Sequence, residues 1–456
     1  MHHSTDTQGD SAAAATRRDL AVRAAVDQGL VTEDDQPVVA LLDVRSVRET
    51  AAAVRDAFTE VAAPGQNVLH TFAVKAASLV PVLRLLADEG IGCEVASPGE
   101  LALARAAGVP ADRTVLDSPA KTGAELREAL ALGIALNADN PQELARLDAL
   151  VTPGAAPASP VGLRVNPQIG EGAIGAMSTA TATSKFGVAL RDPGARDWVV
   201  EAYRERPWLT RLHSHIGSQG IPLELMAEGA RATYDLAEEI NAATGRRQID
   251  TLDLGGGLPV NFSSDEFTPT HRDYARLLAR TVPGLFDGRY GIVTEFGRSL
   301  TAKAGTVLAR VEYAKSAGGR PIAVTHAGAQ IAVRTVFTPD AWPLRVAAYD
   351  AKGMPKRGDT VAQDVAGPCC FAGDLVARDR PLPRLEAGDH AALLDTGAYY
   401  FSNPFGYNSL PRPGVYGFTV ADDEEVSFTA VREPQSLDDI VAESGGAQRD
   451  ALRSAN

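Results

Sequence analysis

A lysine at the end of an apolar run is the first group in this sequence that could do chemistry. The segment FAVKA (72–76) closes such a run and places Lys75 at its end. Burying an ammonium group is costly unless the group is paired or neutralised. A lysine in this position can therefore serve as a nucleophilic amine. A lysine that merely leaves the core at a strand end gives the same pattern, and for this segment alone that interpretation is the more common one.

Two histidines follow another apolar run in the segment HSHIGS (213–218). If the run is a strand, His213 and His215 point to one face, as metal ligands often do. A third ligand with fitting spacing is not evident, so we predict no metal site. An imidazole packed on a flat cofactor ring is the better functional interpretation. A buried histidine satisfied by hydrogen bonds is about equally compatible with the segment.

Two further segments could bind an anion or a ring nitrogen. In DLGGG (253–257), three glycines let backbone N–H groups approach an anion closely, although a tight turn would also use them. In EFGR (295–298), Glu295 and Arg298 could form a plain ion pair. They could also serve a cofactor, with the carboxylate on a ring nitrogen and the guanidinium on a phosphate.

A pair of cysteines lies in a glycine-rich segment, GPCCFAGD (367–374), which is followed by GAY (397–399). A cysteine in such a turn can be a catalytic acid or a small buried hydrophobic residue. The segment alone gives these two interpretations even odds.

The elements that must position these groups repeat along the chain. From about residue 38 to 300, short apolar runs alternate with helical patterns; the runs are VVALLDV, VLHTFAVKA, GCEVAS, TVLDSP, VGLRVN, RLHSHIGS, IDTLDLGGG and GIVTEFGR. Thr122 with Glu125 predicts a capping box, and Asn140, Pro141 and Glu143 predict another helix start. About eight strand–helix units favour a closed (β/α)8 barrel, in which reactive groups lie at the carboxyl ends of the strands.

The length of 456 residues predicts two domains. We expect an α/β fold with a (β/α)8 TIM-like barrel over residues 40–298. Residues 299–456 contain strand-like runs with turns between them, and with residues 1–39 they predict a mostly β domain.

Composition narrows the class of protein. The net charge is −14 without a compensating basic block, so a nucleic-acid backbone would be repelled. No apolar run is long enough for a membrane span, and the N-terminal segment lacks an apolar signal core. Three cysteines without a CxxC pair favour a reducing compartment and argue against structural zinc. We therefore expect a cytoplasmic enzyme without nucleic-acid or membrane partners.

The order and spacing of these motifs together resemble the pyridoxal-5′-phosphate-dependent decarboxylases of the alanine-racemase-like fold. This group contains the diaminopimelate, ornithine and arginine decarboxylases, and the resemblance covers about residues 40–430. FAVKA resembles the family's Y-A-V-K-A, and EVASPGEL (94–101) resembles its D-V-A-S-x-G-E-L. RVNP (164–167), SKFG (184–187), HIGS, GGG, ExGR, GPxC and GAY follow in the family's order.

The resemblance implies a role for each matching residue. Lys75 would carry pyridoxal 5′-phosphate as a Schiff base, His215 would stack on its ring, and Glu295 would keep the ring nitrogen protonated. Cys370 would return a proton after α-decarboxylation of an amino acid. In the family this cysteine comes from the partner subunit, which implies a homodimer with shared active sites. The residues implied in phosphate binding are Ser218, Gly255, Gly256, Gly257, Arg298 and Tyr399.

The sequence departs from the diaminopimelate decarboxylases where those enzymes hold the distal end of the substrate. Phe371 stands where they have an acid directly after the cysteine, and Thr338 stands where a tyrosine is expected. Arg334 aligns with an arginine that binds a distal carboxylate, and His326 begins the stretch that resembles their D-G-G-M. With Arg164, the residues Arg334, Phe371 and His326 are our candidates for substrate contact. Because phenylalanine cannot pair a distal ammonium, we expect a substrate with a less polar or larger distal group.

Three alternatives stay open. The enzyme could be a diaminopimelate decarboxylase proper that makes L-lysine. It could be a racemase on the same fold, although racemases need a second base, usually a tyrosine, and the GPxC and GAY segments fit decarboxylases better. It could also be a catalytically silent relative that binds the cofactor. The sequence does not identify the substrate, its stereochemistry, the pathway or an assembly beyond a dimer.

Overall fold

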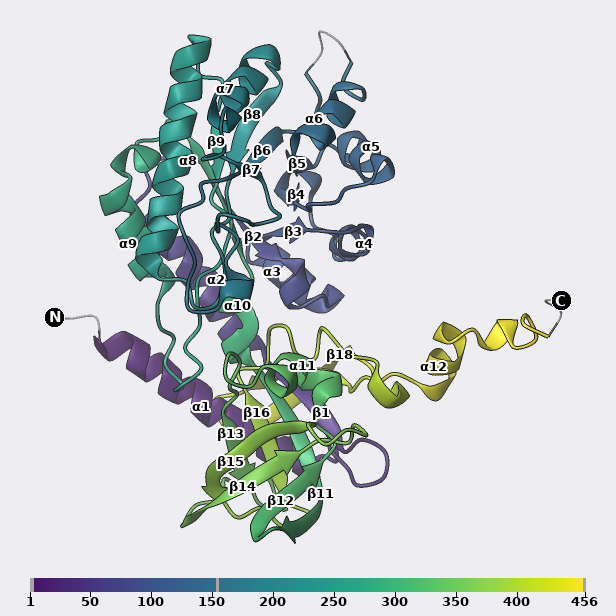
Figure 1. Ribbon diagram of the computed structural model, residues 1–456. Helices are drawn as coiled ribbons and strands as arrows, with labels where there is room; N and C mark the ends of the chain where they lie inside the picture. Colours follow the sequence, from purple (N-terminus) through teal and green to yellow (C-terminus); the bar gives the residue numbers. More distant parts are fainter. Residues whose placement is uncertain (1–3, 153–155, 454–456) are drawn as a thin grey trace. The chain divides into compact units, whose positions relative to one another are not determined.

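The protein is described from a computed structural model covering residues 4–152 and 156–453 (Figure 1). Its chain forms two compact units. One unit consists of Val47–Asn261 and Phe267–Thr301. The other consists of the residues up to Ser46, the short segment Phe262–Glu266 and the residues from Ala302 onwards. Among the described residues, no helix has both the length and the apolar character needed to cross a membrane.

The first unit is a closed barrel of eight parallel strands. Their order around the barrel is β5-β4-β3-β2-β10-β9-β8-β6, and pairing of β6 with β5 closes the ring. This confirms the predicted fold. The strands are β2 (Val68–Ala73), β3 (Gly92–Val95), β4 (Thr114–Leu116), β5 (Ala135–Ala138), β6 (Val161–Asn166), β8 (Leu209–His213), β9 (Thr251–Asp253) and β10 (Gly291–Phe296). A short strand, β7 (Val188–Ala189), pairs with the end of β6.

One predicted barrel strand lies elsewhere. The run VVALLDV forms β1 (Val38–Asp43), which pairs antiparallel with β11 (Gly305–Ala317) and parallel with β17 (Val415–Val420) in the second unit. Its place in the barrel is taken by β5, whose sequence is only ALNA. Both strands are buried along nearly their whole length, so hydrophobicity alone does not distinguish a barrel strand from a strand inside another sheet.

Helices follow the barrel strands and several begin as the sequence predicts. Thr122 and Glu125 form a complete capping box. The Asn140 side chain accepts the backbone N–H of Glu143, with Pro141 in the first turn. The helices of this unit are α2 (Val44–Thr59), α3 (Val80–Asp88), α4 (Pro98–Ala106), α5 (Gly123–Leu132), α6 (Pro141–Asp148), α7 (Ala195–Glu205), α8 (Leu223–Thr244), α9 (His271–Thr281) and α10 (Arg298–Thr301).

The second unit is built on a nine-stranded mixed sheet. Seven strands follow the order β15-β14-β12-β11-β1-β17-β18, and β13 joins the sheet through β16, which pairs with β11. The strands not yet given are β12 (Arg320–Thr325), β13 (Val346–Tyr349), β14 (Thr360–Ala366), β15 (Leu375–Pro383), β16 (His390–Leu394) and β18 (Val426–Arg432). Three helices, α1 (Ser4–Asp27), α11 (Ala329–Phe337) and α12 (Leu437–Glu443), belong to the same unit.

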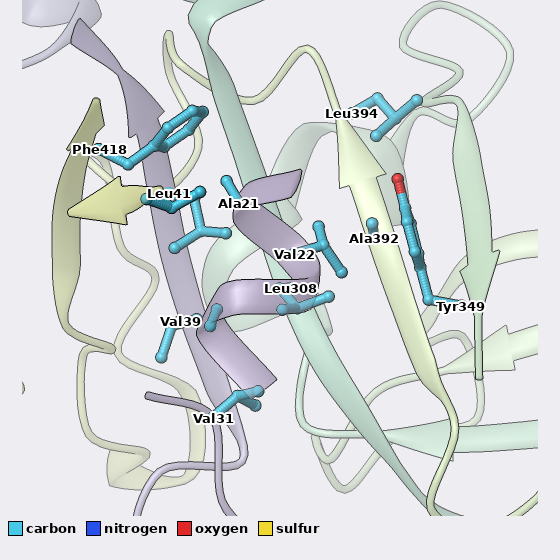
Figure 2. Packing of buried hydrophobic residues seen from close by; sticks show 12 residues of the cluster. Ala21, Val22, Val31, Val39, Leu41, Leu308, Tyr349, Ala392, Leu394 and Phe418 are labelled. Atoms are coloured by element: carbon cyan, nitrogen blue, oxygen red, sulfur yellow. The ribbon is translucent and has the colours of Figure 1, made fainter. Parts of the chain in front are cut away.

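The core of the second unit lies between α1 and the sheet. Figure 2 shows Ala21 and Val22 of α1 against Leu41 of β1 and Leu308 of β11, all almost completely buried. This packing joins the start of the chain to strands from its last third.

Candidate active site

The lysine singled out from the sequence lies just beyond a barrel strand, in a single 3₁₀ turn (Val74–Ala76) after β2. The Lys75 Nζ donates a hydrogen bond of 2.6 Å to the Glu94 Oε2 of the neighbouring strand β3. Glu94 is 1% exposed, whereas the Lys75 side chain is 47% exposed. Burial raises the pKa of the Glu94 carboxyl above its ordinary value, while the Lys75 charge acts to lower it. The amine is thus accessible and has a carboxylate beside it that can accept a proton.

Three buried polar side chains converge at the ends of other strands. His213, the last residue of β8, lies between Asp117, which follows β4, and Glu295 of β10. Its Nδ1 is 3.5 Å from an Asp117 carboxylate oxygen, and its Nε2 is 3.6 Å from a Glu295 oxygen. Both distances are longer than an ordinary hydrogen bond. Within the part of the chain that the structure describes, both ring nitrogens, Asp117 Oδ1 and Glu295 Oε1 are buried without a hydrogen-bond partner.

The charges in this group differ sharply. Burial acts to raise the pKa of Asp117, but the nearby His213, Arg164 and Lys121 outweigh it, so the pKa lies below its usual value. Burial, reinforced by Asp117 and Glu94, holds the pKa of Glu295 well above its usual value. Burial also lowers the pKa of His213. One carboxylate is therefore ionised while Glu295 favours its protonated form.

One ligand atom from each of Asp117, His213 and Glu295 can be chosen so that all lie within 4.8 Å of one another, a spacing that could suit a metal ion. Two features favour a different use. Asp117 already accepts a hydrogen bond of 3.1 Å from Arg164 Nη1, and the raised pKa of Glu295 favours a carboxyl that carries a proton. Such a carboxyl suits a partner with a basic ring nitrogen, to which it can donate its proton.

The glycine run forms a turn that presses against His215 and Glu295. Gly255 and Gly257 have φ angles of 63° and 104°, which favour glycine. A Cβ atom at Gly255 would collide with the His215 ring, and one at Gly256 would collide with the Glu295 carbonyl. The Gly256 N–H donates a hydrogen bond of 3.0 Å to His215 Nδ1. This bond fixes the ring orientation, and burial with nearby Arg164 and Lys75 lowers the His215 pKa well below its usual value, so the ring is neutral.

The remaining barrel residues of the prediction lie at the same strand ends. Arg164 of β6 bonds Asp117, and its guanidinium lies 4.3 Å from the centroid of the Phe186 ring. The guanidinium of Arg164 is thus already engaged by these two side chains. Arg298 is buried at the start of α10, and Ser218 is the last residue of the HIGS segment.

Cys370 belongs to the second unit and lies in a turn organised by a buried carboxylate. Asp374 accepts hydrogen bonds from the backbone N–H of Ala329 (2.6 Å) and of Cys369 (2.7 Å). Cys369 is buried and Cys370 is exposed. The Cys370 N–H donates to Asn408 Oδ1 at 2.8 Å. Of these two cysteines, only Cys370 is exposed at the surface of the described structure.

The predicted substrate residues of this unit separate into two places. The Arg334 guanidinium lies over two rings, 4.5 Å from the Tyr399 centroid and 5.1 Å from the Trp342 centroid. Phe371 stacks on Phe337. His326 follows β12, where its Nε2 lies 3.6 Å from Glu312 Oε2. No described contact joins His326 to Arg334 or Phe371.

The motifs identified the residues that touch one another at the barrel ends, but not all of their neighbours. Asp117 and Asp374 both bind neighbouring groups at these sites, and the sequence analysis did not name either of them as a candidate. Asp117 carries a recognisable signal, because TVLDSP places an acid directly after a predicted barrel strand. Asp374 acts through backbone N–H groups brought together by the fold, and its sequence gives no such signal.

Comparisons with known proteins agree with this geometry. Residues 44–302 match the family model described as "Pyridoxal-dependent decarboxylase, pyridoxal binding domain". A diaminopimelate decarboxylase of Zymomonas mobilis is 31% identical over 375 residues, covering 82% of this chain and 85% of the relative. One from Pseudomonas aeruginosa is 34% identical over 349 residues, covering 76% and 80%. The crystal structure of the Helicobacter pylori diaminopimelate decarboxylase with L-lysine superposes with a TM-score of 0.77 at 25% identity, covering 91% of this chain and 98% of that one.

Proposed function

This chain belongs to the pyridoxal-dependent decarboxylases, and from that premise we propose that it removes the α-carboxylate of an amino acid other than diaminopimelate. The enzyme is a carboxy-lyase whose cofactor is pyridoxal 5′-phosphate. One observation carries the proposal on substrate. Phe371 stands where the diaminopimelate decarboxylases place an acid, and its ring is stacked on Phe337 at a centroid distance of 5.5 Å.

The residues at the barrel ends fit this cofactor. Glu295 has a buried carboxyl oxygen without a hydrogen-bond partner among the described residues, as expected of a group that meets a ring nitrogen. The turn at Gly255–Gly257 approaches both His215 and Glu295 so closely that no Cβ would be accommodated. When bound, pyridoxal 5′-phosphate supplies the electron sink for the bond that breaks. The proposed phosphate contacts are Ser218, Gly255, Gly256, Gly257, Arg298 and Tyr399.

The roles of the chain's own groups follow from their positions. Lys75 offers its amine for covalent attachment, and Glu94, 2.6 Å away, can accept a proton from that nitrogen. Glu295 can share a proton with the cofactor's ring nitrogen, because its surroundings favour a carboxyl that carries one. His215, neutral and fixed by the Gly256 N–H, can offer a flat face to a ring.

Cys370 is proposed as the group that returns the proton to the product carbon. Its thiol is exposed in a turn of the second unit. We propose that the chain forms a homodimer in which Cys370 of one copy completes the site of the other, as in the family that it resembles. A reducing compartment such as the cytoplasm would keep this thiol free.

A free-energy argument supports the proposal that Phe371, in place of the acid, disfavours a distal ammonium. A charged group that loses its partner on binding is penalised by about 1–3 kcal/mol or more. That is about a 5-fold to 140-fold loss in binding, since 1.4 kcal/mol corresponds to a factor of ten. A substrate with such an end would therefore be disfavoured against one without it.

A panel assay tests the proposal. The purified enzyme, supplied with pyridoxal 5′-phosphate, is given single amino acids while CO2 release is measured and the products are identified. We expect CO2 and an amine from an amino acid other than meso-diaminopimelate, and we expect Lys75→Ala to lose both the visible absorbance of the bound cofactor and turnover. Fast, selective formation of L-lysine from meso-diaminopimelate would refute the substrate proposal. Formation of the enantiomer would indicate a racemase instead.

A further inference from the structure

Four aromatic side chains beside Cys370 form a closed group, here called the aromatic cluster: Phe337, Phe371, Phe405 and Tyr407. Phe337 and Phe371 are stacked at 5.5 Å with 10° between their planes. Phe405 meets Phe337 edge-on at 5.9 Å, and Tyr407 meets Phe371 edge-on at 5.3 Å. Phe405 and Tyr407 are stacked at 5.7 Å, which completes the ring of contacts. Such pairs stabilise one another beyond the area that they bury.

The aromatic cluster is not a core. Phe337 is 55% exposed and Phe405 is 37% exposed, while Phe371 and Tyr407 are partly exposed. Its members come from the last residue of α11, from the turn that contains Cys370 and from the loop around η6 (Tyr407–Ser409). Aromatic side chains gathered on a surface indicate a binding site rather than packing.

The backbone links the aromatic cluster to the proposed proton donor. Cys370 directly precedes Phe371, and its N–H is held by Asn408 Oδ1, whose residue directly follows Tyr407. Asn408 has φ 56° and Ser409 has φ 51°, a conformation that is unfavourable for residues other than glycine. The Cys370 backbone and two residues of the aromatic cluster, Phe371 and Tyr407, therefore belong to the same two hydrogen-bonded segments.

Two charged groups, Asp374 and Arg334, lie close to the aromatic cluster in the sequence, and neither can accept a proton from an ammonium at Phe371. Asp374, three residues after Phe371, accepts backbone N–H groups on both carboxylate oxygens and is 3% exposed. Arg334, one helical turn before Phe337, has its guanidinium over the Tyr399 and Trp342 rings. Its Nη1 is buried without a hydrogen-bond partner among the described residues, but as a cation it cannot pair an ammonium. Neither residue is placed to pair an ammonium held against Phe371.

We propose that the aromatic cluster selects the substrate, and that the preferred substrate is an α-amino acid whose side chain ends in a neutral aromatic or large apolar group. This inference rests on the proposed decarboxylase function and gives its substrate class. The distal group packs against the exposed faces of Phe337 and Phe371 while Cys370 stands at the reacting carbon. Apolar contact replaces the charge pairing that an acid at position 371 would provide.

The test compares kcat/KM for phenylalanine, tyrosine and leucine with kcat/KM for lysine, ornithine and meso-diaminopimelate. We expect the aromatic and apolar amino acids to be preferred by at least tenfold, since a single methylene group in an apolar pocket changes selectivity by about 10-fold to 200-fold. Phe371→Leu should lower kcat/KM for phenylalanine and tyrosine through KM while keeping leucine. Phe371→Glu should lower it for all apolar substrates and raise the relative rate for lysine. Tyr313→Ala, which removes a 65% exposed aromatic residue outside the aromatic cluster, is the matched control and should change none of these ratios.

The outcomes separate this inference from the proposed function. Turnover of a cationic amino acid with higher kcat/KM than any apolar one would overturn the inference and leave the decarboxylase in place. A variant could instead dissociate the dimer, as measured by light scattering, and leave the ratios of kcat/KM between substrates unchanged. That result would show that the aromatic cluster is only a subunit contact, and it would also overturn the inference. Bound cofactor absorbance without turnover of any amino acid would instead refute the proposed function.

Discussion

Replacement of Asp253 by asparagine should change how the stability of the barrel depends on pH. Asp253 is the last residue of β9 and is completely buried. Its Oδ2 accepts hydrogen bonds of 3.3 Å from Arg211 Nη2 and from Asn137 Nδ2, and its Oδ1 accepts one of 3.2 Å from Gly255 N–H. Burial, together with the nearby Glu295, nevertheless raises the pKa of Asp253 to about 7. The residue therefore supports the glycine turn while resisting ionisation.

The sign of the effect follows from proton binding. In the unfolded chain the Asp253 carboxyl titrates at its ordinary pKa of 3.8, whereas in the folded barrel it retains its proton up to about pH 7. Between these values the folded state binds more protons than the unfolded state, so the free energy of unfolding falls as the pH rises. The stabilisation of the folded state by this bound proton is fully present below about pH 4 and is lost as the pH rises to about 7. A difference of about 3 pKa units corresponds to about 4 kcal/mol as an upper bound.

Urea unfolding of the wild type and Asp253→Asn from pH 4 to pH 8 measures this contribution. Asparagine keeps an acceptor for Gly255 but cannot ionise. The free energy of unfolding of the variant, minus that of the wild type, should therefore increase as the pH rises, by up to about 4 kcal/mol. Asp250→Asn removes an exposed carboxylate just before the same strand and is the matched control. A difference between wild type and Asp253→Asn that is the same at every pH would refute the reasoning.

Two further predictions concern the cofactor site and the core of the second unit. Glu295→Gln keeps the size of the side chain but removes its exchangeable acid proton, so kcat should fall by about 10²–10⁴-fold while the absorbance of the bound cofactor remains. Steady-state kinetics measure kcat, and a visible spectrum measures the bound cofactor. An unchanged kcat would contradict the role of Glu295. Leu308→Ala opens a cavity against α1 and β1 and should lower the free energy of unfolding by about 2–5 kcal/mol. Urea unfolding measures the second loss, for which exposed Leu437→Ala is the control.

The sequence was sufficient for the barrel but not for the assignment of every strand to it. Alternation of apolar runs and helices predicts the parallel sheet. It does not identify β5, because the ALNA run is short and contains Asn137. That asparagine is buried because its side chain bonds Asp253 on another strand, a contact 116 positions away in the chain. Such a polar residue inside a barrel strand becomes understandable only when its partner is known.

The helix α11 shows the same limit in the second unit. Its sequence AQIAVRTVF lies in a region predicted as mostly β. Short apolar segments of this kind suit a strand or a buried helix equally. The helix starts at Ala329, whose N–H is bound by the Asp374 carboxylate. The tertiary contact that satisfies the helix start therefore comes from a turn 45 positions later.

The cofactor residues and the proposed substrate residues are constrained by different physics. Glu94, Glu295 and His215 are surrounded by other ionisable groups, and the charge of Lys75 contributes to the pKa of each of them. Motifs therefore identify these groups well, because few residue types can replace them. The aromatic cluster lies on an exposed surface of the other unit, where one apolar side chain can replace an acid without leaving a buried charge unpaired. Our proposal that Phe371 selects the substrate therefore requires no change in the cofactor residues of the barrel.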